Sequence, residues 1–405
     1  LIIIIMLIEI ILALIIGVAF GTFTGLFPGI HINLVAAFLL SSLGLFSGIP
    51  VLALVIFIVA MSITHTFIDF IPSIFLGAPE EDSFLAVLPG HELLKEGKGY
   101  AAVVYTLYGG LVALPIILIF SFVFVKFLPD FFEAIRFLIP YILIFVSLFL
   151  IFCEKEWWIS GMVFIFAGML GFLTFNLPVK EPLLPLLSGL FGVSGLIVSL
   201  KDKVKIPKQR IEKLREIKLE KRVFVRNSFA AFVAAPLCSF LPGIGSGHAA
   251  VLGSEIGGSD RKGFLFLVGA INTIVMALSF VTVYAIGKSR TGSAVAVEKL
   301  LGEIALRDLI LIITGVFISA LSAFFVGIFV ARIFSKFLNR VNYSKLSMMV
   351  IGFLFVVNLS LSNWIGLIVL VTASALGVFC ITSRARRIQL MGCLLIPSIV
   401  YYLTA

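Results

Sequence analysis

The sequence predicts an all-α polytopic membrane protein with about ten membrane spans and two Pro-Gly-broken re-entrant hairpins. Hydrophobic residues make up 61% of its 405 residues, charged residues make up only 13%, and the mean hydropathy is +1.21. A soluble protein of this size is closer to half apolar and a quarter charged. The apolar runs are continuous rather than alternating, which favours helical spans over membrane strands.

A basic stretch at 201–226 sets the expected orientation of the chain. It holds eleven Lys or Arg against four Asp or Glu, which supplies +7 of the net charge of +9. Because positive loops stay in the cytoplasm, we interpret it as a cytoplasmic linker with a surface helix from Gln209 to Lys221, not as a nucleic-acid site. Contact with anionic membrane lipids is an alternative role. The linker separates a first membrane repeat at 1–200 from a second at 227–405.

Each half is predicted to contain five spans after one broken hairpin. The hairpins lie roughly at 1–45 and 227–257. The spans of the first half are 51–76, 100–127, 137–153, 158–176 and 183–200, and those of the second are 263–287, 306–332, 346–360, 363–382 and 388–403. An odd number of spans per half gives the two halves opposite orientations, so the sequence predicts two inverted-topology repeats.

The two hairpins carry related Pro-Gly motifs. Residues 25–33 read Gly-Leu-Phe-Pro-Gly-Ile-His-Ile-Asn, and residues 240–248 read Phe-Leu-Pro-Gly-Ile-Gly-Ser-Gly-His. Proline removes a backbone donor and glycine relaxes the backbone, so each apolar helix should break there. In lipid, such a break is tolerated only where protein or a water-filled cavity meets the freed polar groups. Paired breaks in two halves point to the substrate site of a transporter.

The helix breaks also indicate which kind of ligand would bind at the two motifs. A new helix begins after each Pro-Gly, and its first N–H groups lack helical partners, so with the helix dipole they favour a carboxylate or a phosphate. The expected binding residues are Pro28, Gly29, His31 and Asn33 at one tip, and Pro242, Gly243, Gly245, Ser246, Gly247 and His248 at the other.

Charged residues follow the next span of each half. The first half has Glu80, Glu81 and Asp82 after Gly77, and the second has Lys288 and Arg290 after Gly287. In inverted repeats these two groups could approach one cavity from opposite sides, and the cations would then bind substrate charge. Solvated polar loops at span ends are the alternative.

Polar residues inside the spans are candidates for ion coupling. A carboxylate in a span is costly unless it is paired, so Asp69 is expected to be functional, with a hinge role near Pro72 as the alternative. His65 can gain a proton near neutral pH, although hydrogen-bonded packing would also explain it. The residues expected to couple transport to H+ or Na+ are therefore Asp69, His65, Glu80, Glu81 and Asp82. Asn272 and Thr273 offer further hydrogen-bonding groups, and no cofactor or metal site is expected.

Several of these motifs together match a known pattern. The matching pieces are Gly21–Asn33, the block Gly77–Asp82 with Leu88–His91 and Glu96–Gly99 after it, and Pro242–His248. At these residues the chain resembles the large membrane subunit of tripartite tricarboxylate transporters (TctA type), in its archaeal branch. The resemblance implies a multi-pass permease of the cell membrane, not an enzyme. It would carry citrate-like carboxylates with a small membrane subunit and a periplasmic binding protein.

Other interpretations of the same motifs stay open. Polyprenyl-phosphate translocases (flippases) also use paired Pro-Gly hairpins, and the phosphate of a lipid carrier is an anion that would suit the same helix ends. A membrane enzyme acting on a lipid phosphate would need His31 or His248 as its nucleophile or base. A homodimer is expected only by analogy with such folds. The favoured function is transport of an organic anion by alternating access between the two repeats.

Overall fold

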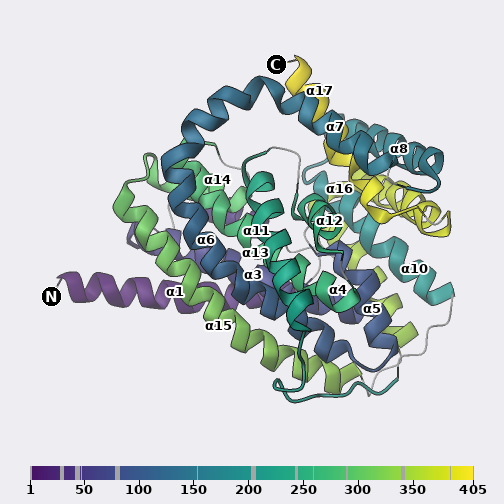
Figure 1. Cartoon of the computed structure of the whole chain (residues 1–405), viewed down its shortest axis with the longest axis horizontal. Coiled ribbons are helices and arrows are strands. Elements are labelled where there is room, and N and C mark those ends of the chain that lie inside the picture. Colours follow the sequence, from purple (N-terminus) through teal and green to yellow (C-terminus); the bar gives the residue numbers. More distant parts are fainter. Residues whose placement is uncertain are drawn as a thin grey trace.

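The computed structural model describes most of the chain as helices (Figure 1). The described residues are 2–27, 32–41, 46, 48–77, 83–152, 154–201, 207–241, 245–258, 260–288, 291–338, 343–383 and 385–404. No strand occurs among them. The all-α fold class predicted from the continuous apolar runs is therefore confirmed for this part of the chain.

The first half contains ten α-helices among the described residues. They are α1 (Ile2–Leu26), α2 (Ile32–Ser41), α3 (Val51–Ile68), α4 (Phe70–Leu76), α5 (Val87–Lys95), α6 (Gly99–Ile135), α7 (Ile139–Phe152), α8 (Trp157–Asn176), α9 (Leu183–Leu187) and α10 (Ser194–Lys201). The π-helical segment η4 (Ser188–Val193) joins α9 to α10, and short 3-10 turns precede α5 and α7.

The second half begins with α11 (Lys221–Phe240), inside the stretch that the charge pattern assigned to the linker. The helices that follow are α12 (Ser246–Gly257), α13 (Arg261–Ile286), α14 (Gly292–Leu301), α15 (Leu306–Leu338), α16 (Tyr343–Thr382), the 3-10 turn η5 (Arg387–Met391) and α17 (Gly392–Thr404).

Nine helices of the described part are long and apolar enough to cross a membrane. Eight of the ten predicted spans fall on seven of them, since α16 contains two predicted spans, and α1 and α11 are the other two. The predicted spans at 137–153 and 183–200 fall instead on shorter apolar helices, Ile139–Phe152 and Leu183–Val198. A helix of 14 residues such as α7 rises about 21 Å, less than the hydrocarbon core of a bilayer.

Helix α16 is two helices joined at Asn363, as the predicted spans 346–360 and 363–382 require. Asn363 has a left-handed φ of 66°, and its side-chain oxygen accepts from the N–H groups of Ile365 and Gly366 at 3.0 and 3.2 Å. Leu354 and Leu370, on opposite sides of this turn, belong to one buried cluster. In a straight helix they would be about 24 Å apart, so α16 folds back on itself.

The described helices stop at both Pro-Gly motifs. Helix α1 ends at Leu26 and α2 begins at Ile32, while α11 ends at Phe240 and α12 begins at Ser246. The predicted interruption of an apolar helix is thus present in each half. Helices α11 and α12 pack against each other, whereas α2 packs on α14 and α3.

The predicted surface helix from Gln209 to Lys221 is wrong. Residues 207–220 form no helix, because their polar groups bond to the segment that joins α5 to α6. The buried Gln209 side chain accepts from the Gly99 N–H at 2.8 Å and donates to the Leu94 carbonyl at 3.0 Å. The Arg210 N–H donates to the Gly97 carbonyl at 2.8 Å. These bonds replace the ones that a helix would have made.

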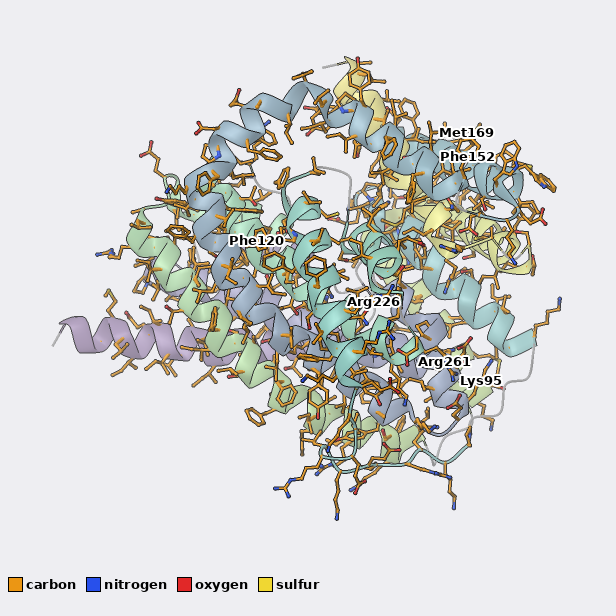
Figure 2. All side chains as sticks on the ribbon, viewed as in Figure 1. Lys95, Phe120, Phe152, Met169, Arg226 and Arg261 are labelled. Atoms are coloured by element: carbon orange, nitrogen blue, oxygen red, sulfur yellow. The ribbon has the colours of Figure 1, made fainter. Side chains whose placement is uncertain are left out.

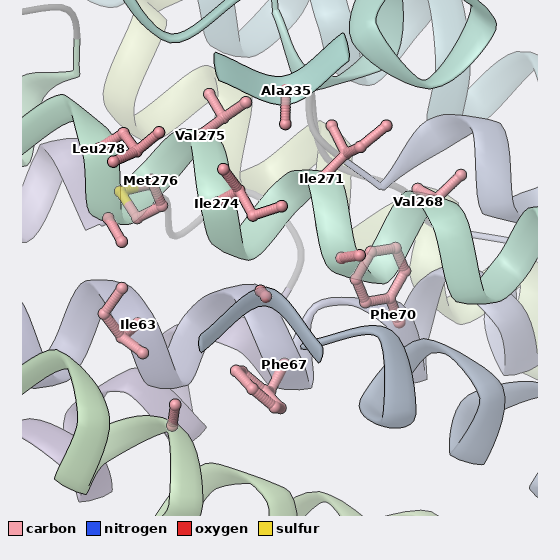
Figure 3. Close-up of a cluster of buried hydrophobic side chains, with 14 of the residues drawn as sticks. Ile63, Phe67, Phe70, Ala235, Val268, Ile271, Ile274, Val275, Met276 and Leu278 are labelled. Atoms are coloured by element: carbon pink, nitrogen blue, oxygen red, sulfur yellow. The ribbon is translucent and has the colours of Figure 1, made fainter. Parts of the chain in front are cut away.

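The centre of the molecule is formed by α3, α4 and α13, the most deeply buried spans of the described part. Figure 3 shows side chains of α3 (Ile63, Phe67) and α13 (Ile271, Ile274) in one buried apolar cluster. Such a core has to be filled by closely packed apolar side chains. Polar groups inside it are therefore conspicuous.

Helices α6 and α13 cross at backbone contact. A Cβ atom on Gly109 of α6 would lie 2.0 Å from the Phe266 carbonyl oxygen, and one on Gly269 of α13 would lie 2.1 Å from the Thr106 carbonyl oxygen. Only glycine permits this approach, which is the usual way membrane helices pack closely.

The outer helices expose apolar side chains. Phe152 on α7 and Met169 on α8 lie at the periphery (Figure 2), and both are exposed. Helix α1 runs along α3, and its N-terminal part extends beyond the rest of the molecule (Figure 1). An exposed apolar surface of this extent suits lipid rather than water.

Candidate functional site

Asp69 lies in the protein interior at the junction between α3 and α4. Asp69 is 1% exposed, and its Oδ2 accepts a hydrogen bond from Nδ2 of Asn272 on α13 at 3.1 Å. Pro72 explains the junction, since it has no N–H for the Ile68 carbonyl, where α3 ends. The structure thus brings together two polar residues that lie in separate halves of the sequence.

His65 lies one helical turn before Asp69 and contacts the end of α1. The Nδ1 atom of His65 lies 3.0 Å from the hydroxyl of Thr24, and His65 is 3% exposed. A Cβ atom on the neighbouring Gly25 would lie 3.1 Å from the Asp69 nitrogen. The end of α1, directly before the first Pro-Gly motif, therefore packs at the level of Asp69.

Further hydroxyl contacts link the two halves around the same helices. Ser62 on α3 donates to Ser293 at the start of α14, with 2.8 Å between the oxygens. The hydroxyls of Thr66 on α3 and Thr273 on α13 are 3.5 Å apart. All four residues are buried. Buried polar contacts thus connect α3 to α13 and α14 of the second half.

The first turn of α12 contains the described part of the second motif. Gly245 caps the helix, and its N–H donates to Nδ1 of His248 at 3.1 Å. Because Nδ1 accepts, the ring proton lies on Nε2. Ser246 and His248 are buried, as is Gly247. His248 therefore caps its own helix, a local role that the sequence did not indicate.

The predicted cations at the end of α13 are only partly described. Gly287 ends the helix with a left-handed φ of 61°, and the exposed Lys288 places its Nζ 4.9 Å from the ring centroid of Phe132 on α6. Asn33 belongs to α2, but its side chain lies outside the description. The other predicted residues outside the described part are Pro28, Gly29, His31, Glu80, Glu81, Asp82, Pro242, Gly243 and Arg290.

One group of basic side chains was not expected from the sequence. His91 on α5 lies close to Gly77, and Arg387 on η5 lies close to Gly195, whose Cβ position is 3.9 Å from the Gly77 carbonyl oxygen. Burial, together with the charges of Lys95 and Arg387, lowers the pKa of His91 to about 4. In the sequence, His91 was notable only as part of the matching piece Leu88–His91, and no role was predicted for Arg387.

Comparison with known proteins identifies the class to which this arrangement belongs. The model of the tripartite tricarboxylate transporter TctA family matches residues 11–392, and the chain belongs to that family. It is a multi-pass membrane transporter protein and not an enzyme.

The chain is also similar to an uncharacterized protein of Methanocaldococcus jannaschii. The two are 32% identical over 398 residues, which cover 94% of this chain and 96% of that protein. No solved structure matches the chain.

Proposed function

We propose that this chain is a permease that moves an organic anion, such as a di- or tricarboxylate, by alternating access between two inverted-topology repeats. The observation that carries the proposal is the buried bond between Asp69 and Asn272, which joins the two halves beside the first Pro-Gly motif. A buried carboxylate at such a junction is costly, and it is expected where an ion or a substrate is handled.

The central helices support the inverted repeats. Residues 51–76 and 261–286 are both 26 residues long, and they end at Gly77 and Gly287 with φ of 65° and 61°. Each central span packs on a long helix of the other half: α3 on α15, and α13 on α6. Such an exchange is what a pseudo-two-fold relation between the halves predicts.

The packing of α12 supports a position of the second motif near Asn272. Helices α12 and α13 are joined by a short turn and run antiparallel, and the Cβ position of Gly253 lies 3.3 Å from Leu267 and 3.4 Å from Ile271. His248 is five residues further towards the start of α12, which is about 7.5 Å along the helix. On the antiparallel α13, the same shift from Leu267 and Ile271 leads to the stretch from Asn272 to Met276.

The substrate carboxylates would be bound by the helix N-termini that follow the motifs. The first N–H groups of α12 and the positive end of its dipole favour an anion, and the glycines of the Gly245–Gly247 segment would let a ligand approach the backbone closely. Lys288 and Arg290 would add positive charge. In the family, the large subunit works with a small membrane subunit and a periplasmic binding protein, and we propose the same partners here.

Asp69 and His65 would couple transport to an ion. The Asp69 carboxyl group accepts from Asn272 and so holds α3 against α13. Binding of H+ or Na+ to the carboxylate would weaken this bond between the halves, and the halves could then move relative to each other. Glu80, Glu81 and Asp82 are further candidates for this coupling.

Uptake of radiolabelled citrate into proteoliposomes, with H+ or Na+ gradients applied in turn, tests the function. We expect Asp69→Asn, His248→Ala and Arg290→Ala to lower the uptake rate about tenfold or more, since each removes a charge-assisted or capping interaction. The control is Arg307→Ala, because the Arg307 side chain is 85% exposed. Undiminished uptake in all three variants would remove this site, and movement of polyprenyl phosphate without citrate uptake would favour the flippase.

A further inference from the structure

Two adjacent arginines at the start of the last span have opposite surroundings. Arg386 is half-exposed, and its Nε lies 3.0 Å from Glu154 Oε1 and its Nη1 3.6 Å from Glu255 Oε1. Arg387 is more buried, and its Nη2 donates to the Phe191 carbonyl and to the Ser194 hydroxyl at 3.3 Å. Within the described ranges, no carboxylate pairs with Arg387. The more exposed arginine has two acidic partners, and the more buried one has none.

The Arg387 guanidinium is directed into the protein. It lies 5.8 Å from the centroid of the Phe191 ring, and its Nε is inaccessible to solvent without an acceptor in the described part of the chain. Arginine has five N–H donors, so two bonds from Nη2 leave the Nε and Nη1 donors unused. Backbone carbonyls and a hydroxyl accept hydrogen bonds but do not neutralise the charge, and an unpaired buried cation is costly.

Besides Phe191 and Ser194, the surroundings of Arg387 include two glycines and a histidine. A Cβ atom on Gly195 would lie 3.5 and 3.7 Å from the two terminal nitrogens of Arg387, and 3.9 Å from the Gly77 carbonyl oxygen. His91 is also close to Gly77, with its Cε1 2.9 Å from the position of a Gly77 Cβ atom. The end of α4, the middle of α5 and the starts of α10 and η5 therefore meet near this guanidinium.

We propose that Arg387 and Ser194 form a binding site for an oxyanion, the carboxylate or phosphate group of a ligand. The planar guanidinium matches both groups with charge-assisted hydrogen bonds, and the ligand would supply the negative charge that the described residues do not. Its two residues lie on η5 and α10, outside both Pro-Gly motifs. Arg387 is the first residue of a candidate span, and the end of a span is the level at which both soluble acids and lipid head groups are present.

Thermal unfolding of the purified full chain in an uncharged, lipid-free detergent tests the site. One series is titrated with citrate or inorganic phosphate, and a second with mixed micelles that contain phosphatidylglycerol or, as a control, phosphatidylcholine. We expect an anion to raise the unfolding temperature of the wild type. Arg387→Gln should weaken its apparent affinity about tenfold or more, as removal of a hydrogen bond to a charged group does. The adjacent Arg386→Gln should leave it within about twofold, since Arg386 is already paired with Glu154 and Glu255.

The two series distinguish the sources of the anion. A shift with citrate or phosphate assigns a soluble ligand, and a shift confined to phosphatidylglycerol assigns a lipid head group. His248→Ala should keep the Arg387-dependent shift even where it abolishes citrate uptake, so this site and the transport site can fail independently. If Arg387→Gln does not fold, Arg387→Lys keeps the charge and should bind more weakly than the wild type. Equal shifts in the wild type and the Arg387 variants, or no shift with any anion, would overturn the proposal.

Discussion

At the scale of single residues, the polar groups of the core have partners that only the folded chain provides. Asp69 was a candidate from its position in an apolar span, and the Asn272 amide that it binds is 203 residues away in sequence. The need for a partner could be inferred from the cost of a buried charge, but its identity could not. The same holds for His65, whose neighbour Thr24 is 41 residues away.

The low pKa of His91 predicts an acid-sensitive stability. Its pKa is about 4 in the folded protein against 6.5 for a free histidine, so the unfolded chain binds more protons between these values. Stability from the neutral ring is therefore present above pH 6.5 and falls as the pH decreases towards 4.

The unfolding temperature of the wild type should thus decrease between pH 7 and 4.5, as differential scanning fluorimetry can measure. His91→Gln cannot gain a proton, and we expect its unfolding temperature to depend less steeply on pH over this range. Parallel curves for the two proteins would contradict the prediction.

At the scale of elements, most helices could be predicted and some connections could not. Continuous apolar runs predicted the spans. The boundary between the predicted spans 346–360 and 363–382 coincides with the turn at Asn363. The surface helix predicted at 209–221 was wrong because the hydrogen bonds of this segment go to Gly97 and Gly99, which composition does not reveal. The group around Arg387 was missed because it depends on helices that are distant in sequence, α5, α10 and η5.

The crossing of α6 and α13 gives a prediction for glycine substitutions. Gly109→Ala and Gly269→Ala would each place a methyl group about 2 Å from a carbonyl oxygen of the other helix. Overpacking of this kind typically costs about 1–3 kcal/mol, and more where backbone must move. The matched control is Gly352→Ala on α16, where no atom lies within 4 Å of the new Cβ atom. We expect the first two variants, but not the control, to lower the unfolding temperature in detergent.

At the scale of the whole molecule, the buried polar contacts connect two halves that alternating access would move. The Ser62 and Ser293 hydroxyls are 2.8 Å apart, so cysteines at both positions should form a disulfide under mild oxidation. We expect this crosslink to stop citrate uptake and a reductant to restore it. Ser62→Cys alone is the control, and Cys238, Cys380 and Cys393 are buried without disulfides. Full uptake by the crosslinked protein would show that this boundary does not move.

The glycine crossing of α6 and α13 also limits how the halves can rearrange. With backbone against backbone, these helices have no side-chain layer that could slide or repack, whereas between α3 and α15 the side chains of Ile56 and Val59 lie opposite Gly315. The crossing would thus serve as the fixed axis of a rocking motion, with the displacement growing away from it. Spin labels on α6 and α13 should keep their separation when substrate is added, while labels on α3 and α15 change theirs.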